Sequence, residues 1–215
     1  MRLSFLAALL AFGVHTIAFA ESAPAAPQLV GNAEAGQTKS AACVACHGVD
    51  GNSVDPSFAK IAGQHADYTV RHLHLFKSGE RENAIMTAQA SLLSDQDMSD
   101  LAAYFATQKV RAGITDETLV ARGQALYRGG ASTGVPSCMG CHGPNGRGNP
   151  AAKYPAIAGQ HSGYSKAQLE RFRGGIIYGK DDYQNKQIMS QVAKNLSDAD
   201  IDALASYLEG LHTAE

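Results

Sequence analysis

Every cysteine of this 215-residue chain lies in one of two copies of a C-x-x-C-H motif, at residues 43–47 and 138–142. Two thiols three residues apart on a helical turn can add to the vinyl groups on one side of a porphyrin, and the next residue then points its imidazole at the iron. A redox dithiol needs no histidine there, and a tetrahedral zinc site would have to join two motifs that lie 95 residues apart. The motif therefore predicts two covalently bound c-type haems.

Each predicted haem takes its attachment points and one axial ligand from its own motif. The thioethers are assigned to Cys43 and Cys46 and to Cys138 and Cys141, and the axial imidazoles to His47 and His142. This assignment uses all four cysteines, so no thiol is left for a disulfide.

The rest of the chain repeats in the same order as the motif. Three further segments recur: IAGQH at residues 61–65 and 157–161, IM at 85–86 and 188–189, and LSD-x-D at 93–97 and 196–200. Between the first and second of these the offset grows from 96 to 103 residues, so a longer loop is expected at residues 176–186. Because order, spacing and identity all recur, we predict two domains from a duplication, at residues 21–110 and 117–215.

Within each copy the apolar residues follow a helical period. Residues 33–43 are expected to form one short helix, and residues 68–77 and 164–173 a matching pair. Ser94 and Ser197, each followed by acidic residues, are typical helix N-caps. Alternating strand patterns are absent, so the fold class is all-α. A domain of about 90 residues buries only a small core, and we expect the haem to complete it.

The sixth ligand of each iron is expected to be a methionine. Met86 and Met189 stand at equivalent repeat positions, in predicted loops well downstream of the histidines. Met98 lies on the apolar stripe of a helix and suits packing, and Met139 sits inside a motif spacer. That Met86 and Met189 are simply core side chains stays open. His/Met ligation raises the haem potential and leaves no open position, which favours electron transfer over substrate chemistry.

Two further histidines also recur and could serve as the sixth ligands instead. His65 and His161 follow the motif histidines by only 18 and 19 residues, beside Gly-Gln at the start of a helix. We interpret them as surface residues or as residues that support the ligands.

The first 20 residues have the pattern of a secretory signal peptide. Arg2 supplies a positive start, residues 3–19 are almost wholly apolar, and residues 18–20 form a small-x-small cleavage site before Glu21. An uncleaved membrane anchor is the alternative. Cleavage would place the mature protein in the periplasm of a Gram-negative bacterium.

The composition excludes two other classes of protein. Charged residues make up 18% of the chain, the net charge is −2, and 45% of the residues are hydrophobic. These values exclude a strongly basic nucleic-acid-binding protein and a disordered chain. No later segment reaches the ~20 apolar residues of a membrane span, so we expect a soluble mature protein.

Together these motifs resemble the dihaem cytochrome c4 family, over nearly the whole chain from residue 31 to 212. The resemblance implies two tandem cytochrome c-like haem domains related by a pseudo-two-fold axis. It also implies a monomeric periplasmic electron carrier without substrate turnover, which associates peripherally with the membrane. The expected electron donor is a cytochrome bc complex, and the expected acceptor is a haem-copper terminal oxidase. One alternative is the dihaem cytochrome subunit of a flavocytochrome c sulfide dehydrogenase. A dihaem peroxidase or a thiosulfate-oxidising cytochrome is another, but would need an open iron position.

One position departs from the family pattern. A proline before the IAGQ stretch places a backbone carbonyl near the proximal imidazole in the family; here Pro155 matches it, whereas the first copy has Ala59. The carbonyl survives this change, but the restricted φ of proline does not. Since hydrogen bonds to a ligand tune its basicity, we expect the two haems to differ in potential.

Overall fold

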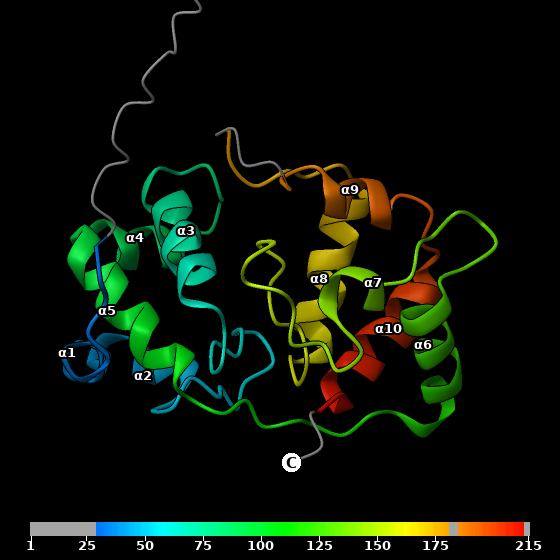
Figure 1. Ribbon diagram of the computed structural model, residues 1–215, viewed down its shortest axis with the longest axis horizontal. Helices are drawn as coiled ribbons and strands as arrows, with labels where there is room; N and C mark the ends of the chain where they lie inside the picture. Colours follow the sequence, from blue (N-terminus) through cyan, green and yellow to red (C-terminus); the bar gives the residue numbers. More distant parts are fainter. Residues whose placement is uncertain (1–28, 181–184, 213–215) are drawn as a thin grey trace, which may run out of the picture.

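The computed structural model describes residues 29–180 and 185–212, and within them the chain forms two helical lobes (Figure 1). The predicted signal peptide and part of the loop expected at residues 176–186 lie outside the described residues. The described residues contain no strand, only two isolated β-bridges, so the all-α prediction is confirmed.

In the part of the chain that the structure describes, each lobe contains five helices. The first lobe contains α1 (Ala33–Lys39), α2 (Ala41–His47), α3 (Ala66–Lys77), α4 (Ala84–Ser91) and α5 (Asp95–Ala106). The second contains α6 (Glu117–Gly129), α7 (Met139–His142), α8 (Ser162–Arg173), α9 (Ile188–Ala193) and α10 (Asp198–Gly210). The packing repeats as well. Helices α1 and α3 pack on α5, and α4 packs on α3; in the same way α6 and α8 pack on α10, and α9 packs on α8.

The single helix expected over residues 33–43 is in fact two helices that meet at Ser40. The Ser40 hydroxyl donates to the Gln37 carbonyl at 2.7 Å, and the residue is buried at the corner. Local bonds of this kind compete with helix continuation. The break gives α2, which carries the first motif, its own direction.

The first and last helices of each lobe cross at a glycine. A Cβ atom on Gly36 in α1 would lie 2.0 Å from the Asp100 carbonyl oxygen in α5. On Gly123 in α6 it would lie 2.3 Å from the Ala203 carbonyl oxygen in α10. Only glycine allows two helix backbones to approach this closely, which explains why Gly-Gln recurs upstream of both motifs.

Both long C-terminal helices begin with the predicted serine caps. Ser94 and Ser197 each complete a capping box with the aspartate three residues later, Asp97 and Asp200. The apolar stripes predicted behind these caps are buried: Met98, Leu101, Ala102 and Phe105 in α5, and Ile201, Leu204, Ala205 and Leu208 in α10.

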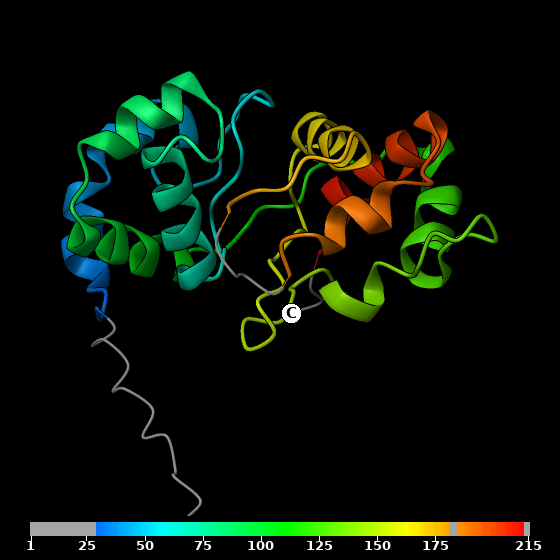
Figure 2. The same cartoon turned by 90° about the horizontal axis from the view of Figure 1, so that it is seen from above.

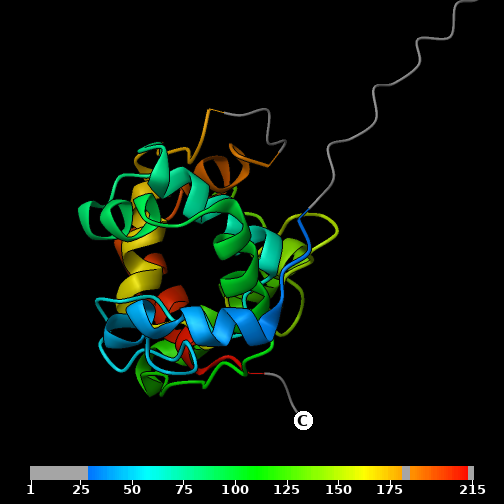
Figure 3. The same cartoon turned by 90° about the vertical axis from the view of Figure 1, so that its left-hand side faces the viewer.

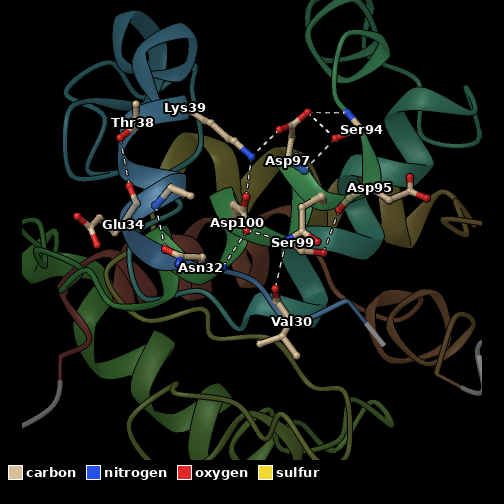
Figure 4. Close-up of polar contacts among 12 residues, drawn as sticks. Val30, Asn32, Glu34, Thr38, Lys39, Ser94, Asp95, Asp97, Ser99 and Asp100 are labelled. Atoms are coloured by element: carbon tan, nitrogen blue, oxygen red, sulfur yellow. Dashed lines mark hydrogen bonds and ion pairs between the residues drawn. The ribbon is translucent and has the colours of Figure 1, made fainter. Parts of the chain in front are cut away.

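A lysine connects α1 to the first turn of α5 in the first lobe (Figure 4). Lys39 Nζ lies 2.6 Å from Asp100 Oδ2 and 2.7 Å from Asp97 Oδ1. Asp100 is buried and also accepts the backbone N–H of Asn32 at 2.8 Å. The hydrogen bond from Lys39 is the largest cause that lowers the pKa of Asp100 to about 2.

The lobes lie side by side (Figure 2), and in Figure 3 the first lobe faces the viewer with the second behind it. Residues 107–116 join them along one side (Figure 1). Asn52 holds this link by donating to the Lys109 carbonyl at 2.9 Å and accepting from the Arg111 N–H at 2.8 Å. Lys60 Nζ donates to the Arg111 carbonyl at 2.7 Å. The link is therefore bonded to the first lobe rather than extended in solvent.

Membrane-spanning length is not reached by any helix in residues 29–180 and 185–212, whose longest helices have 13 residues.

Replacing Gly123 by alanine is expected to lower the free energy of unfolding by about 1–3 kcal/mol, as other overpacked sites do. The new methyl group would overlap the Ala203 carbonyl and the Tyr207 Cβ. Gly129→Ala, in the same helix with nothing within 4 Å of the new Cβ, is the matched control and should not destabilise the protein. Denaturant titration of the holoprotein measures both, and equal stability of the two variants would refute the crossing as a constraint.

The Asp100 carboxylate should make stability depend on acid pH. Because its pKa is lowered in the folded state, its contribution is fully present above its ordinary pKa of 3.8 and is lost as pH falls towards about 2. Asp100→Asn should therefore be less stable than the parent at neutral pH, and the difference should shrink below pH ~4. Asp95→Asn, which changes an exposed carboxylate of the same helix, is the control. A difference that stays constant down to the acid limit would contradict this assignment.

Candidate haem-binding sites

Each C-x-x-C-H motif lies at the end of a short helix. Helix α2 carries Cys43 and Cys46 and ends on His47, and α7 ends on His142. The next residue in each copy is a glycine with positive φ, 79° at Gly48 and 75° in the second copy. This left-handed conformation turns the chain away directly after the histidine, so the imidazole is not covered by its own backbone.

The proximal imidazoles are fixed through one ring nitrogen. The His47 Nδ1–H donates to the Ala59 carbonyl at 2.8 Å, and the His142 Nδ1–H donates to the Pro155 carbonyl at 2.9 Å. A carbonyl only accepts, so Nδ1 carries the proton and Nε2 is left as the nitrogen that can bind a metal. The carbonyl expected to survive the change from proline to alanine is present, with a bond of almost the same length.

Burial favours the neutral form of both imidazoles. His142 is 6% exposed and His47 is half-buried. Burial is the largest influence on the pKa of each and lowers it, opposed by the hydrogen bond to the carbonyl. A neutral imidazole is the form that binds iron.

Burial makes the first cysteine of each motif a poor redox thiol. Burial raises the pKa of Cys43, and it raises the pKa of Cys138 to about 11. A redox-active dithiol requires a lowered pKa, because the thiolate is the nucleophile. These thiols suit attachment to a porphyrin better than disulfide exchange.

Met86 and Met189 lie in helices, so their predicted loop position is wrong. Met86 is in the first turn of α4, where its N–H donates to the side chain of the N-cap Asn83 at 2.9 Å, and Met189 is in the first turn of α9. Both side chains are half-buried, and α4 packs on α3 as α9 packs on α8. Their role as iron ligands stays a prediction.

The other two methionines among the described residues behave as expected. Met98 is fully buried in α5, and Met139 packs against the core of the second lobe.

His161 is not a surface residue. It is 7% exposed, and its Nε2–H donates to the Ser53 carbonyl of the first lobe at 2.9 Å. Its Nδ1 lies 3.5 Å from the Glu209 carboxylate. His161 is therefore committed to the contact between lobes rather than to an iron. The matching Nε2 of His65 is buried without a hydrogen-bond partner.

Sequence reasoning missed the residues that join the lobes. The Arg81 guanidinium of the first lobe is buried, stacks on the Tyr178 ring of the second at 4.6 Å and donates to the Tyr164 hydroxyl at 2.8 Å. No spacing signal marks Arg81. Gln64 and Gln160 also form hydrogen bonds to the opposite lobe. Both lie in the repeated IAGQ segment, but the repeat alone did not indicate that they form the contact between the lobes.

The residues present fit two c-type haems. Each lobe offers two cysteines three residues apart and an imidazole oriented by a carbonyl, with a half-buried methionine on a separate helix. This donor set is soft sulfur and imidazole nitrogen, which suits haem iron.

Comparison with known proteins agrees with this geometry. The family model for Cytochrome c matches the chain twice, over residues 33–109 and 120–212. Cytochrome c4 of Pseudomonas aeruginosa is 48% identical over 183 residues, which cover 85% of this chain and 90% of the relative. The crystal structure of reduced recombinant cytochrome c4 from Pseudomonas stutzeri has a TM-score of 0.79 and 46% identity, and covers 85% of this chain and 100% of that one. At greater distance, a thiosulfate dehydrogenase electron acceptor of Stutzerimonas stutzeri is 33% identical over 179 residues, 81% of each protein.

The two matches to the family model and the two motifs establish two tandem cytochrome c domains, each with a c-type haem. With relatives of this identity along most of its length, the chain belongs to the dihaem cytochrome c4 family of electron-transfer proteins.

Proposed function

We propose that the protein is a periplasmic electron carrier of a respiratory chain, which accepts electrons from a cytochrome bc complex and delivers them to a haem-copper terminal oxidase. It turns over no substrate of its own. The N-terminal segment directs export and is cleaved before Glu21. The observation that carries the proposal is the duplicated donor set, in which each domain offers one histidine and one methionine.

In this proposal Cys43, Cys46, Cys138 and Cys141 hold the haems, and the axial pairs are His47 with Met86 and His142 with Met189. A c-type haem supplies one-electron chemistry when bound. The Ala59 and Pro155 carbonyls hold the imidazoles in one tautomer and one orientation. With both axial positions supplied by the chain, neither site offers a substrate an open position, which favours a carrier over an oxidase or peroxidase.

Replacing either methionine should remove one axial sulfur. The near-infrared charge-transfer band of Met-sulfur-ligated ferric haem should fall to about half in Met86→Ala and in Met189→Ala and be absent in the double variant, because one ligand is lost per site. Met98→Leu, a similar change in the buried core, should leave the band intact. A parent band that accounts for one haem or none would contradict the proposed ligand set.

A second function is favoured by one relative, the thiosulfate dehydrogenase electron acceptor of Stutzerimonas stutzeri. On that reading the chain receives its electrons from a sulfur-oxidising dehydrogenase instead of a cytochrome bc complex. The carrier role and the two haem sites are the same in both readings.

Reconstitution separates the two donors. With a purified terminal oxidase present, the oxidised protein should support oxygen uptake when a cytochrome bc complex and quinol are supplied, and uptake should stop when the protein is omitted. Replacing the bc complex by thiosulfate dehydrogenase and thiosulfate tests the second reading. Oxygen uptake with thiosulfate dehydrogenase but not with the cytochrome bc complex would overturn the proposed donor. No oxygen uptake with either donor would overturn the oxidase as the acceptor.

A further inference from the structure

Two glutamines connect the domains by equivalent pairs of hydrogen bonds. Gln160 of the second domain accepts the Lys60 N–H at 2.9 Å and donates to the Lys60 carbonyl at 2.8 Å. Gln64 of the first domain accepts the Ala156 N–H at 3.0 Å and donates to the Ala156 carbonyl at 2.8 Å. Each amide thus pairs with both backbone groups of one residue in the other domain.

The orientation of each amide is determined by its partners. The Oε1 atom of Gln160 also accepts the His161 N–H at 3.0 Å, and that of Gln64 accepts the His65 N–H at 2.9 Å. Two donors therefore face the oxygen and one carbonyl faces the nitrogen. Turning the amide over would place an NH₂ group against two N–H groups.

Lys60 and Ala156, which pair with these glutamines, come immediately after Ala59 and Pro155 in the chain. The carbonyls of Ala59 and Pro155 are the ones that accept hydrogen bonds from the proximal histidines. The peptide group between Ala59 and Lys60 accepts from His47 at its oxygen and donates to Gln160 at its nitrogen. The peptide group between Pro155 and Ala156 accepts from the other proximal histidine and donates to Gln64. Each proximal imidazole is therefore linked through one peptide group to a glutamine of the opposite domain.

A peptide group transmits polarisation because its C=O and C–N bonds are conjugated. Accepting a hydrogen bond from its N–H moves electron density towards its oxygen, and chains of hydrogen bonds strengthen one another in this way. A stronger acceptor draws the Nδ1 proton of the imidazole and makes Nε2 more electron-rich. An electron-rich ligand stabilises ferric over ferrous iron and so lowers the potential.

We infer that Gln160 tunes the potential of the haem in the first domain and Gln64 that of the haem in the second, each across the domain boundary. The inference rests on the proposed roles of His47 and His142 as axial ligands. Both glutamines are positioning residues, since neither contacts a haem ligand directly. The tuning is crosswise: each haem depends on a residue of the domain that does not bind it.

The test compares three variants in which a glutamine of this chain is replaced by methionine, which keeps side-chain length without the amide. Gln160→Met should raise the potential of the first haem alone, and Gln64→Met that of the second alone. Gln168→Met is the matched control: its Oε1 accepts from Arg81 across the same interface at 3.3 Å but touches neither peptide group. It should shift neither haem selectively.

The measurement is a redox titration of the holoprotein followed by NMR of the haem methyl signals. The signals are assigned to a domain by their through-space contacts with Cys46 or Cys141, independently of the methionines. Strengthening of about 10–30% in a neutral hydrogen bond corresponds to roughly a 1.1- to twofold change in the equilibrium constant for electron exchange between the haems.

Gln160→Glu is a fourth variant, which distinguishes loss of polarisation from simple loosening of the interface. A carboxylate keeps the acceptor for the Lys60 N–H and strengthens the polarisation, so the first haem should shift to lower potential, opposite to the methionine variant. Equal shifts of both haems, no shift, or the same shift in Gln168→Met would overturn the inference. If Met86→Ala and Met189→Ala instead keep the full near-infrared band, the proposed ligand set is refuted. That result does not depend on how the glutamine variants behave.

Discussion

The hydrogen bond from each proximal imidazole to a backbone carbonyl twelve or thirteen residues further on is the contact on which the rest of each domain depends. It selects the tautomer that leaves Nε2 for iron, and it ties the motif helix to the loop that leads into IAGQ. The loop can make this bond only if its own ends are anchored. In both domains they are, because the IAGQ isoleucine bonds back to a glycine carbonyl of the same loop at 2.8 Å and its glycine bonds to the C-terminal helix at 2.8 Å.

The same segment also forms the contact between the domains, so the orientation of His47 and His142 and the arrangement of the domains are not independent. The residue after each carbonyl is held by a glutamine of the other domain. His161 and Arg81 add buried polar contacts to the same interface. Buried polar contacts of this kind define one arrangement, since a shifted one would leave donors and acceptors unpaired.

The sequence was sufficient for most of what depends on neighbours along the chain. The motif predicted the haems, the repeat predicted two domains, and Ser94 and Ser197 predicted the start of two helices that the structure confirms. It was insufficient where residues far apart meet. The buried position of His161 depends on tertiary packing. The break at Ser40 was missed for another reason, because the Ser40 hydroxyl bonds to the Gln37 carbonyl and competes with helix continuation. The helical position of Met86 was missed because α4 has only eight residues and a weak apolar period.

The bonded link between the domains has a consequence for how the protein stores charge. Asn52 and Lys60 hold residues 109–111 against the first domain by hydrogen bonds. The connection between the domains is therefore a rigid linker rather than a flexible one. A flexible tether would let the two redox centres sample many separations, and the exchange of an electron between them would follow the statistics of a coil. Here the separation is a property of the fold. One molecule can therefore hold two electrons acquired one at a time and redistribute them internally at a rate that dilution does not change.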